Sequence, residues 1–470
     1  MLFVANTCTL DIAARQALQK KTIGSHSNTM NHLNRKLGLV ENLFEILHDL
    51  GGMIDVNFAR IEGSLTPDIL RQALNLVQKR HPMLQVHLIE LADGLYFESE
   101  GTQEIPLRVI DKQYENQGIE IAEDELHQKF SGGLAPLCRV TFLHSSTSNG
   151  ISEIIATFHH AITDGMSCMR FFDDLLSYCQ QIAAGDRIAE VVTMQLLPPL
   201  ETLLASHLSR NNNVEETQEQ SSQEIQPPEL IIEGEALLSD RRTRLLTRIL
   251  SKEMTMMLRN RCRQEETTVH GALCAAILFG AAKITFTGTP IHLSCGSSVN
   301  LRKFCEPKVK DGYMGCLATF MGSIPHVLKE NSTFWNLARD CKSKISNNLN
   351  RGVPINQLKS QRLQQVNKSF ILQLSARKMG RTDTVEISNI GKFNFLDKYG
   401  DFKLKELYFA TGQHIIGSCF CLGVVTFHQQ LFCRFTHVVP LVSTQTAELF
   451  ADSVMDTMQK ACTSPSLTFQ

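Results

Sequence analysis

A strongly polar segment near the middle of the chain divides it into two parts that each carry their own apolar pattern. Residues 209–229 include Asn211-Asn212-Asn213 and Pro227-Pro228 and few apolar side chains, so burial would not offset the entropy of ordering them. At 470 residues, the chain is also longer than one hydrophobic core usually supports. We therefore expect lobes over residues 32–208 and 230–470, a flexible linker over 209–229 and an N-terminal extension over 1–31.

Both parts mix strand and helix patterns. Alternating apolar residues predict a strand over 54–61, and Thr66 before Pro67 predicts the start of a helix that ends near His81-Pro82, with a second strand over 84–88. In the second part, the segment after Thr268 is apolar on nearly every side, which indicates a helix buried between other layers. Because strands and helices do not strictly alternate, we predict a mixed α+β fold in two halves rather than one doubly wound α/β sheet.

Composition narrows the partners and the compartment. The formal net charge of -2 provides no basic field of the kind that concentrates nucleic acid, so we expect no nucleic-acid partner. The 14 cysteines form no CxxC pair, and we expect reduced thiols in the cytoplasm rather than a disulfide framework or a zinc site. No apolar run reaches the length of a transmembrane segment. We also expect the chain to act as a monomer.

The run His159-His160-Ala161-Ile162-Thr163-Asp164-Gly165 lies between a predicted strand over 154–158 and a predicted helix. A histidine at a strand end projects into the cleft beyond the sheet edge, where an imidazole can remove a proton from a hydroxyl or an amine. We therefore predict that His160 is the general base of an acyl transfer, in which the activated acceptor attacks a thioester directly. The chain has no GxSxG elbow, which disfavours a hydrolase.

Asp164 and the first histidine leave other interpretations open. Asp164 either orients the imidazole of His160 or points backwards into a structural ion pair. The two histidines and Asp164 could also bind a metal ion, but adjacent residues of a strand point to opposite faces, so we expect no metal. The simplest alternative is an Asp-Gly turn that happens to follow two histidines.

The run resembles the HHxxxDG signature of the condensation-domain and polyketide-associated acyltransferase superfamily, which includes relatives of chloramphenicol acetyltransferase and phthiocerol dimycocerosyl transferases. Further segments that resemble the family's motifs are Arg80-His81-Pro82-Met83-Leu84, Thr268-Val269-His270-Gly271-Ala272-Leu273, Ser298-Val299-Asn300-Leu301-Arg302 and Ser388-Asn389-Ile390-Gly391. Their order and spacing extend the resemblance over about residues 32–460. Two departures disfavour the plant branch and affect the second lobe: the DFGWG motif is absent, and Gly315-Cys316 replaces a common Gly-Asn.

The resemblance implies a structure for the site. Two chloramphenicol-acetyltransferase-like lobes would form a V with a tunnel between them, and His160 would be the catalytic base at its middle. His159 and Gly165 would support the site, and Asp164 would pair with Arg302 instead of orienting the base. Removing one partner of such a buried pair would cost roughly 3 to 5 kcal/mol.

The resemblance also implies a function. It is acyl transfer from acyl-CoA or an acyl carrier protein to an alcohol, giving an ester, with a lipophilic acceptor, no bound cofactor, and a carrier protein or polyketide synthase as partner. Ser388 and Asn389 would line the tunnel or bind the oxyanion, although Ser-Asn-Gly equally suits a turn. Alternatives are a free-standing condensation domain that forms an amide and an inactive protein that docks carriers. The intact motif argues against inactivity.

Overall fold

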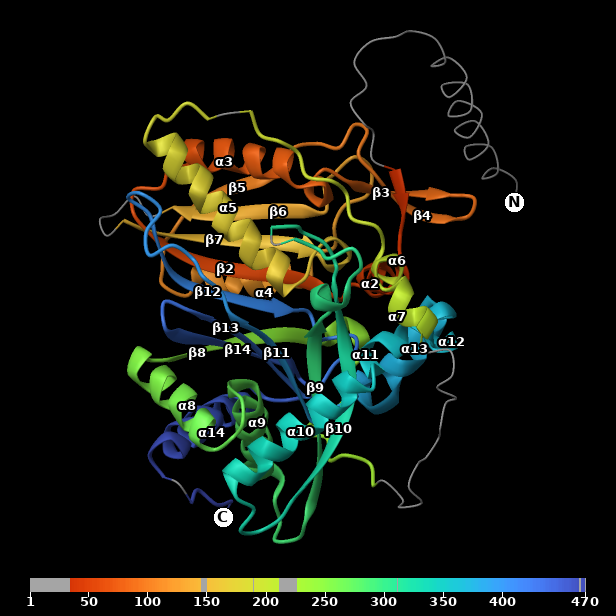
Figure 1. Ribbon diagram of the computed structural model, residues 1–470, viewed down its shortest axis with the longest axis vertical. Helices are drawn as coiled ribbons and strands as arrows, with labels where there is room; N and C mark the ends of the chain where they lie inside the picture. The colour runs from red at the N-terminus through yellow and green to blue at the C-terminus, as the bar shows by residue number, and fades with distance from the viewer. Residues whose placement is uncertain are drawn as a thin grey trace.

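In a computed structural model, the structure describes residues 34–144, 150–188, 190–210, 226–310, 312–464 and 466–469. Two large sheets, each covered by helices, lie one above the other (Figure 1). The mixed α+β fold in two halves is therefore confirmed. The predicted extension over residues 1–31 and most of the predicted linker lie outside the described residues. A V shape with a tunnel stays a prediction.

The first sheet has five strands in the order β12-β2-β7-β6-β5. Helices α3 and α5 cover one face, and α4 contacts β2 and β7 (Figure 1). The strands are β2 (Ile54–Glu62), β5 (Leu107–Asp111), β6 (Cys138–His144), β7 (Ile151–His159) and β12 (Lys403–Thr411), and the helices are α3 (Pro67–Arg80), α4 (Gln117–Glu125) and α5 (Gly165–Ala183). The predicted cap and end of α3 are confirmed, because Thr66 accepts a hydrogen bond from Ile69 N and the helix stops before His81-Pro82.

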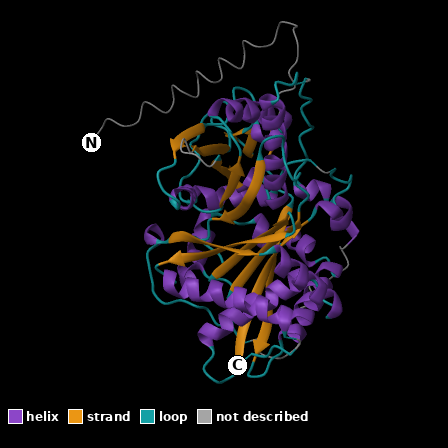
Figure 2. Ribbon diagram, turned by 90° about the vertical axis from the view of Figure 1, so that its left-hand side faces the viewer, coloured by secondary structure: helices purple, strands orange, loops and turns teal. Residues whose placement is uncertain are grey.

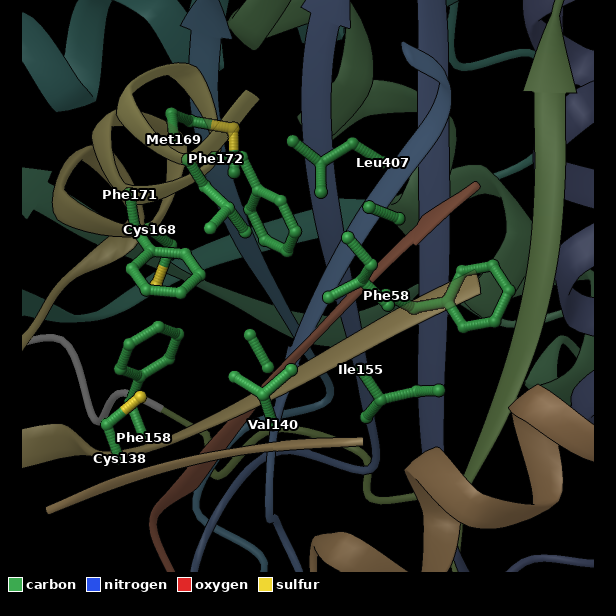
Figure 3. Packing of buried hydrophobic residues seen from close by; sticks show 14 of the residues in the cluster. Phe58, Cys138, Val140, Ile155, Phe158, Cys168, Met169, Phe171, Phe172 and Leu407 are labelled. Atoms are coloured by element: carbon green, nitrogen blue, oxygen red, sulfur yellow. The ribbon is translucent and has the colours of Figure 1, made fainter. Parts of the chain in front are cut away.

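Aromatic packing fixes α5 on the first sheet. The rings of Phe158 and Phe171 meet edge to face at 5.0 Å, and those of Phe171 and Phe172 do so at 5.4 Å. Figure 3 shows these rings on the α5 side of the sheet, whereas Phe58 and Ile155 point to the other side. The first sheet therefore has two buried faces, one under its own helices and one toward the second half of the chain.

The second sheet has six strands in the order β10-β9-β11-β13-β14-β8, with helices packed against it (Figure 2). Its strands are β8 (Arg242–Leu250), β9 (Ile291–Asn300), β10 (Ala318–Leu328), β11 (Val385–Lys392), β13 (Phe420–Phe427) and β14 (Gln430–Val439), and its helices are α8 (Lys252–Gln264), α9 (Val269–Thr285), α10 (Phe334–Asn350) and α14 (Thr444–Thr463). The prediction of a buried helix is confirmed: α9 starts after its cap Thr268, packs against α10 and α14, and is buried on nearly all sides.

Smaller elements lie along one side of the two large sheets (Figure 1). A three-stranded sheet has the order β1-β4-β3. These elements are β1 (Asn34–Lys36), α2 (Leu39–Asp49), β3 (His87–Leu91), β4 (Gly94–Glu98), α6 (Leu200–Leu203), α7 (Ala205–Arg210), α11 (Val353–Asn356), α12 (Gln361–Gln364) and α13 (Lys368–Ala376). Among the described residues, no single helix is long and apolar enough to span a membrane, although α8 and α9 together, bent by 103°, have the length and composition to do so.

The predicted strand over 84–88 is wrong in its first half. Residues Pro82–Leu84 form a 3₁₀ turn, closed by hydrogen bonds from Leu84 N to His81 O at 3.0 Å and from Gln85 N to Pro82 O at 2.9 Å. The strand begins only at His87. Proline fixes its own φ in the range of such a turn, and the apolar side chains that suggested a strand are simply buried.

β12 crosses from one half of the chain to the other. It lies in the sequence of the second part but pairs antiparallel with β2 of the first sheet, with Tyr408 opposite Phe58. A Cβ added at Gly423 of β13 would lie 2.9 Å from the carbonyl oxygen of Phe409, so the glycine lets β12 lie directly against the second sheet. The predicted boundaries of the two lobes stay predictions. The structure shows, however, that β12 belongs by sequence to the predicted lobe over 230–470 but completes the sheet of the other half.

Candidate active site

The histidine motif forms the predicted strand, turn and helix. β7 ends at His159, a 3₁₀ turn covers His160–Ile162, and α5 begins at Gly165. Asp164 caps the helix by accepting a hydrogen bond from Ser167 N at 2.9 Å. A Cβ on Gly165 would lie 2.8 Å from Cγ1 of Ile390, so only glycine allows the end of β11 to pack against the start of α5.

His160 has two acceptors at one ring nitrogen. Its Nδ1 lies 3.0 Å from the carbonyl oxygen of Thr163 and 3.1 Å from Oδ2 of Asp55. Because both partners are oxygens that accept, Nδ1 carries the hydrogen and Nε2 of the neutral ring has a free lone pair. The ring stacks on Phe44 of α2 at 4.1 Å and 13°, and the side chain is 16% exposed. This arrangement presents Nε2 as a proton acceptor.

Asp55 is the carboxylate that faces His160. It lies on β2 and is buried, and Thr411 of β12 donates a hydrogen bond to its other oxygen. Burial raises the pKa of Asp55, against the opposing effects of the His160 imidazole and the Thr411 hydroxyl. A positive charge formed on His160 would therefore be stabilised by the buried carboxylate of Asp55, and the carboxylate would be stabilised by the positive charge in turn. Asp55, and not Asp164, contacts the imidazole.

His159 is buried and held away from His160. Its Nδ1 accepts a hydrogen bond from Ala161 N at 3.0 Å, and its Nε2 donates to Glu45 of α2 at 2.7 Å. Burial by itself raises the pKa of Glu45, but hydrogen bonds from His159 and His48 outweigh it and hold this pKa at about 2. Burial lowers the pKa of His159 to about 4. These contacts fix the end of β7 to α2, in keeping with the supporting role expected for His159.

Glu45, His48 and His159 could in principle hold a metal ion, because their ligand atoms lie within 4.8 Å of one another. Each histidine, however, uses its other ring nitrogen to accept from a backbone N–H: His159 from Ala161, and His48 from Phe130 at 2.9 Å. A metal-bound imidazole normally donates through its second nitrogen. These residues therefore suit two N–H donors on one carboxylate and do not fit a metal ion.

Asp164 and Arg302 form the expected ion pair. Arg302 Nη1 lies 2.6 Å from Oδ2 and Nη2 lies 3.0 Å from Oδ1, and Leu317 N also donates to Oδ2 at 3.0 Å. Burial would raise the pKa of Asp164, but the charge and hydrogen bonds of Arg302 and Ser167 hold it below its ordinary value. The pair joins the first turn of α5 to the second part of the chain and leaves Asp164 no role at His160.

Ser167 extends this contact. Its hydroxyl lies 3.0 Å from Nη2 of Arg302 and 2.9 Å from Asp164, and it accepts from Gly315 N at 3.1 Å. The segment with the unusual Gly315-Cys316 therefore reaches the pair through backbone groups, which do not depend on the missing asparagine side chain.

Ser388 and Asn389 lie in the middle of β11, just before Ile390, which packs on Gly165. Asn389 Oδ1 accepts a hydrogen bond from Gly391 N at 2.9 Å where the register of β11 shifts against β13. This contact favours the turn interpretation for Asn389. Ser388 is half-buried, and its place in a tunnel stays a prediction.

Sequence reasoning missed three contacts of the histidines: Asp55, Glu45 and Phe44. The available signal for Asp55 was a carboxylate inside the apolar strand over 54–61. Glu45 and Phe44 gave no such signal, because one acidic and one aromatic residue are ordinary on an amphipathic helix.

Comparisons with known proteins give one family-model match and several similar solved structures. Residues 240–402 match the family model described as phthiocerol/phthiodiolone dimycocerosyl transferase C-terminus. The structure resembles polyketide synthase associated protein 5 from Mycobacterium tuberculosis, with a TM-score of 0.62 at 18% identity over 92% of this chain and 98% of that one. The fold is that of condensation domains and polyketide-associated acyltransferases, and the family-model match covers the central part of the second half of the chain.

Two further solved structures have the same architecture. The first condensation domain of the calcium-dependent antibiotic synthetase gives a TM-score of 0.67 at 11% identity, over 93% of this chain and 98% of that one. A trichothecene 15-O-acetyltransferase from Fusarium sporotrichioides also gives 0.67 at 11% identity, over 93% and 97%. No curated protein matches the sequence significantly. At these sequence identities, the likeness shows the fold alone.

The Asp164–Arg302 pair predicts a loss of stability in Asp164→Ala. The substitution removes a helix cap and leaves Arg302 without its partner, so the free energy of unfolding should fall by about 3 kcal/mol in urea denaturation. Asp186→Ala, at an exposed aspartate just after α5, is the matched control and should change it by less than about 0.5 kcal/mol. Equal stability of the two variants would contradict a structural role for Asp164.

Proposed function

We propose that the protein is an acyltransferase that moves an acyl group from a thioester to an alcohol, with His160 as the general base. The observation that carries the proposal is that two oxygens, from Asp55 and from the Thr163 carbonyl, accept at Nδ1 of His160. Nε2 is therefore left as a proton acceptor. The match of residues 240–402 to an acyltransferase family model and the likeness to polyketide synthase associated protein 5 support acyl transfer as the class of reaction.

The reaction needs one proton acceptor and no protein nucleophile. Nε2 of His160 takes the proton of the acceptor hydroxyl while the hydroxyl oxygen attacks the thioester carbon. The tetrahedral intermediate then expels the thiolate, which takes the proton back from the imidazolium, so the products are an ester and a thiol. Asp55 stabilises the imidazolium between these two steps, because its carboxylate lies 3.1 Å from Nδ1.

We further propose acyl-CoA or an acyl carrier protein as the donor, a lipophilic alcohol as the acceptor and the cytoplasm as the compartment. No bound cofactor takes part in these steps. The names of two similar structures, polyketide synthase associated protein 5 and the condensation domain of a polyketide synthase, support a carrier protein as donor or partner. Amide formation is the second candidate, supported by the likeness to the antibiotic-synthetase condensation domain.

His160→Ala should reduce turnover at least about a hundredfold, since general-base catalysis typically contributes 10²- to 10⁴-fold. The measurement is thiol release from short-chain acyl-CoA and acyl-pantetheine with a panel of lipophilic alcohols and amines. His292→Ala, at a half-buried histidine of β9, is the control and should retain wild-type turnover.

Turnover with alcohols but not amines would support an ester-forming enzyme. Turnover with amines but not alcohols would support amide formation. Unchanged turnover in His160→Ala would contradict His160 as the base in either reaction.

Asp55→Asn should reduce kcat by about 10- to 100-fold with little change in KM. A hydrogen bond to a charged group contributes about 1.5 to 3 kcal/mol, and only the imidazolium formed during the reaction gains it fully.

Asp186→Asn is the control and should leave both kcat and KM unchanged. If Asp55→Asn lowered the melting temperature and changed KM as much as kcat, Asp55 would have a structural role only.

A further inference from the structure

A cavity of about 380 Å³ lies between the two sheets. One wall comes from α4, β2 and β12 and carries Phe58 and Tyr408; the opposite wall comes from β8 and β14 and carries Thr247 and Arg434. The lining thus combines aromatic rings with cationic and hydroxyl groups, which is the composition of a site for an amphipathic small molecule.

Arg434 is the unusual group in this cavity. It is only 2% exposed, and among the described residues no acceptor bonds its Nη1 and no carboxylate lies within ion-pair distance of its guanidinium. The guanidinium carbon lies 4.6 Å from the ring centre of Tyr408 and 5.7 Å from that of Phe58. Burial lowers the pKa of Arg434 to about 10, so the side chain still carries its charge at neutral pH.

The two carboxylates that interact with Arg434 through space, Glu406 and Glu123, are already paired with other arginines. Arg60 lies 3.1 Å from Glu406, and Arg244 lies 2.6 Å from Glu123. A buried charge without a partner is costly, and ring contacts compensate only part of that cost. Arg434 is therefore poised for an anion that the chain itself does not supply.

Thr247 provides a second free donor beside it. It lies directly opposite Arg434 in the pairing of β8 and β14, and its buried Oγ1 has no hydrogen-bond partner among the described residues. Residues opposite each other in an antiparallel pair have Cβ atoms about 5 Å apart and share one face of the sheet. The two groups can therefore bind the same small ligand.

The cavity is distinct from the site at His160. Phe58 is three residues from Asp55 along β2, which corresponds to about 10 Å. On the second sheet, Gly423 stands between Ser388 and Arg434 in one cross-strand row, and β12 lies over this glycine. A ligand in the cavity would therefore occupy a different place from the reacting groups.

We propose that this cavity binds an organic carboxylate with an apolar body. The carboxylate accepts hydrogen bonds from Arg434 and Thr247, and its hydrocarbon part lies against Phe58 and Tyr408. The lining favours a monoanion over a phosphate dianion, because Glu406 also faces the cavity and would repel a second negative charge. The site does not depend on the proposed acyl transfer.

The test is the melting temperature of the full chain with millimolar hexanoate or inorganic phosphate at constant ionic strength. Hexanoate should raise the melting temperature of the wild type and of Arg259→Met, which removes an exposed arginine of α8 as the control. Arg434→Met should melt no lower than the wild type without ligand, because it removes an uncompensated buried charge, and should not respond to hexanoate.

Thr247→Val keeps the shape of the side chain and should respond to hexanoate more weakly than the wild type, which keeps the proposal testable if Arg434→Met does not fold. An equal response of the wild type and Thr247→Val would overturn the proposal, as would no response of the wild type. A larger response to phosphate than to hexanoate would overturn the carboxylate assignment.

Discussion

The ion pair between Asp164 and Arg302 joins the two halves of the chain at the point where α5 begins. The same carboxylate caps α5 and accepts from the backbone of Leu317, so one buried group fixes both the helix and the neighbouring segment of the second half. The turn that carries His160 lies between this fixed helix start and the end of β7. The carbonyl of Thr163, one residue before Asp164, is thereby positioned to accept from His160.

His160 is held from three directions by parts of the chain that are distant in sequence. Phe44 of α2 covers its ring, Asp55 of β2 accepts at Nδ1, and the Thr163 carbonyl accepts at the same atom. The stack on Phe44 limits the orientation of the ring, and the two acceptors at Nδ1 favour the tautomer with its hydrogen on that atom. A base that is already oriented requires no reorganisation when the acceptor arrives, which is how such a site contributes to rate.

The sequence predicted the local features of this site well, because they depend on local rules. The strand, turn and helix around His159 and His160, the cap Thr66 and the helix start near Thr268 follow from side-chain periodicity and from the hydrogen bonds that short polar residues make. The Asp164–Arg302 contact came from the family resemblance, since no periodic pattern links residues so far apart.

What the sequence did not predict depends on packing between distant segments. β12 joins the sheet of the other half because Gly423 allows a close approach, and no property of residues 403–411 reveals that partner. The strand pattern over 54–61 assigns no role to Asp55, and only the placement of β2 beside β7 brings it to His160. The packing of the two sheets against each other likewise places Arg434 in its cavity.

The tautomer of His160 tests the central claim most directly. In protein with ¹⁵N-labelled histidine, the ring nitrogens of His160 can be assigned by comparison with His160→Gln, and their shifts distinguish a nitrogen that bears a hydrogen from one that does not. The account predicts that the neutral ring carries its hydrogen on Nδ1 and that Nε2 is unprotonated. A neutral ring with the hydrogen on Nε2 would contradict it, because that atom could not accept the proton of the acyl acceptor.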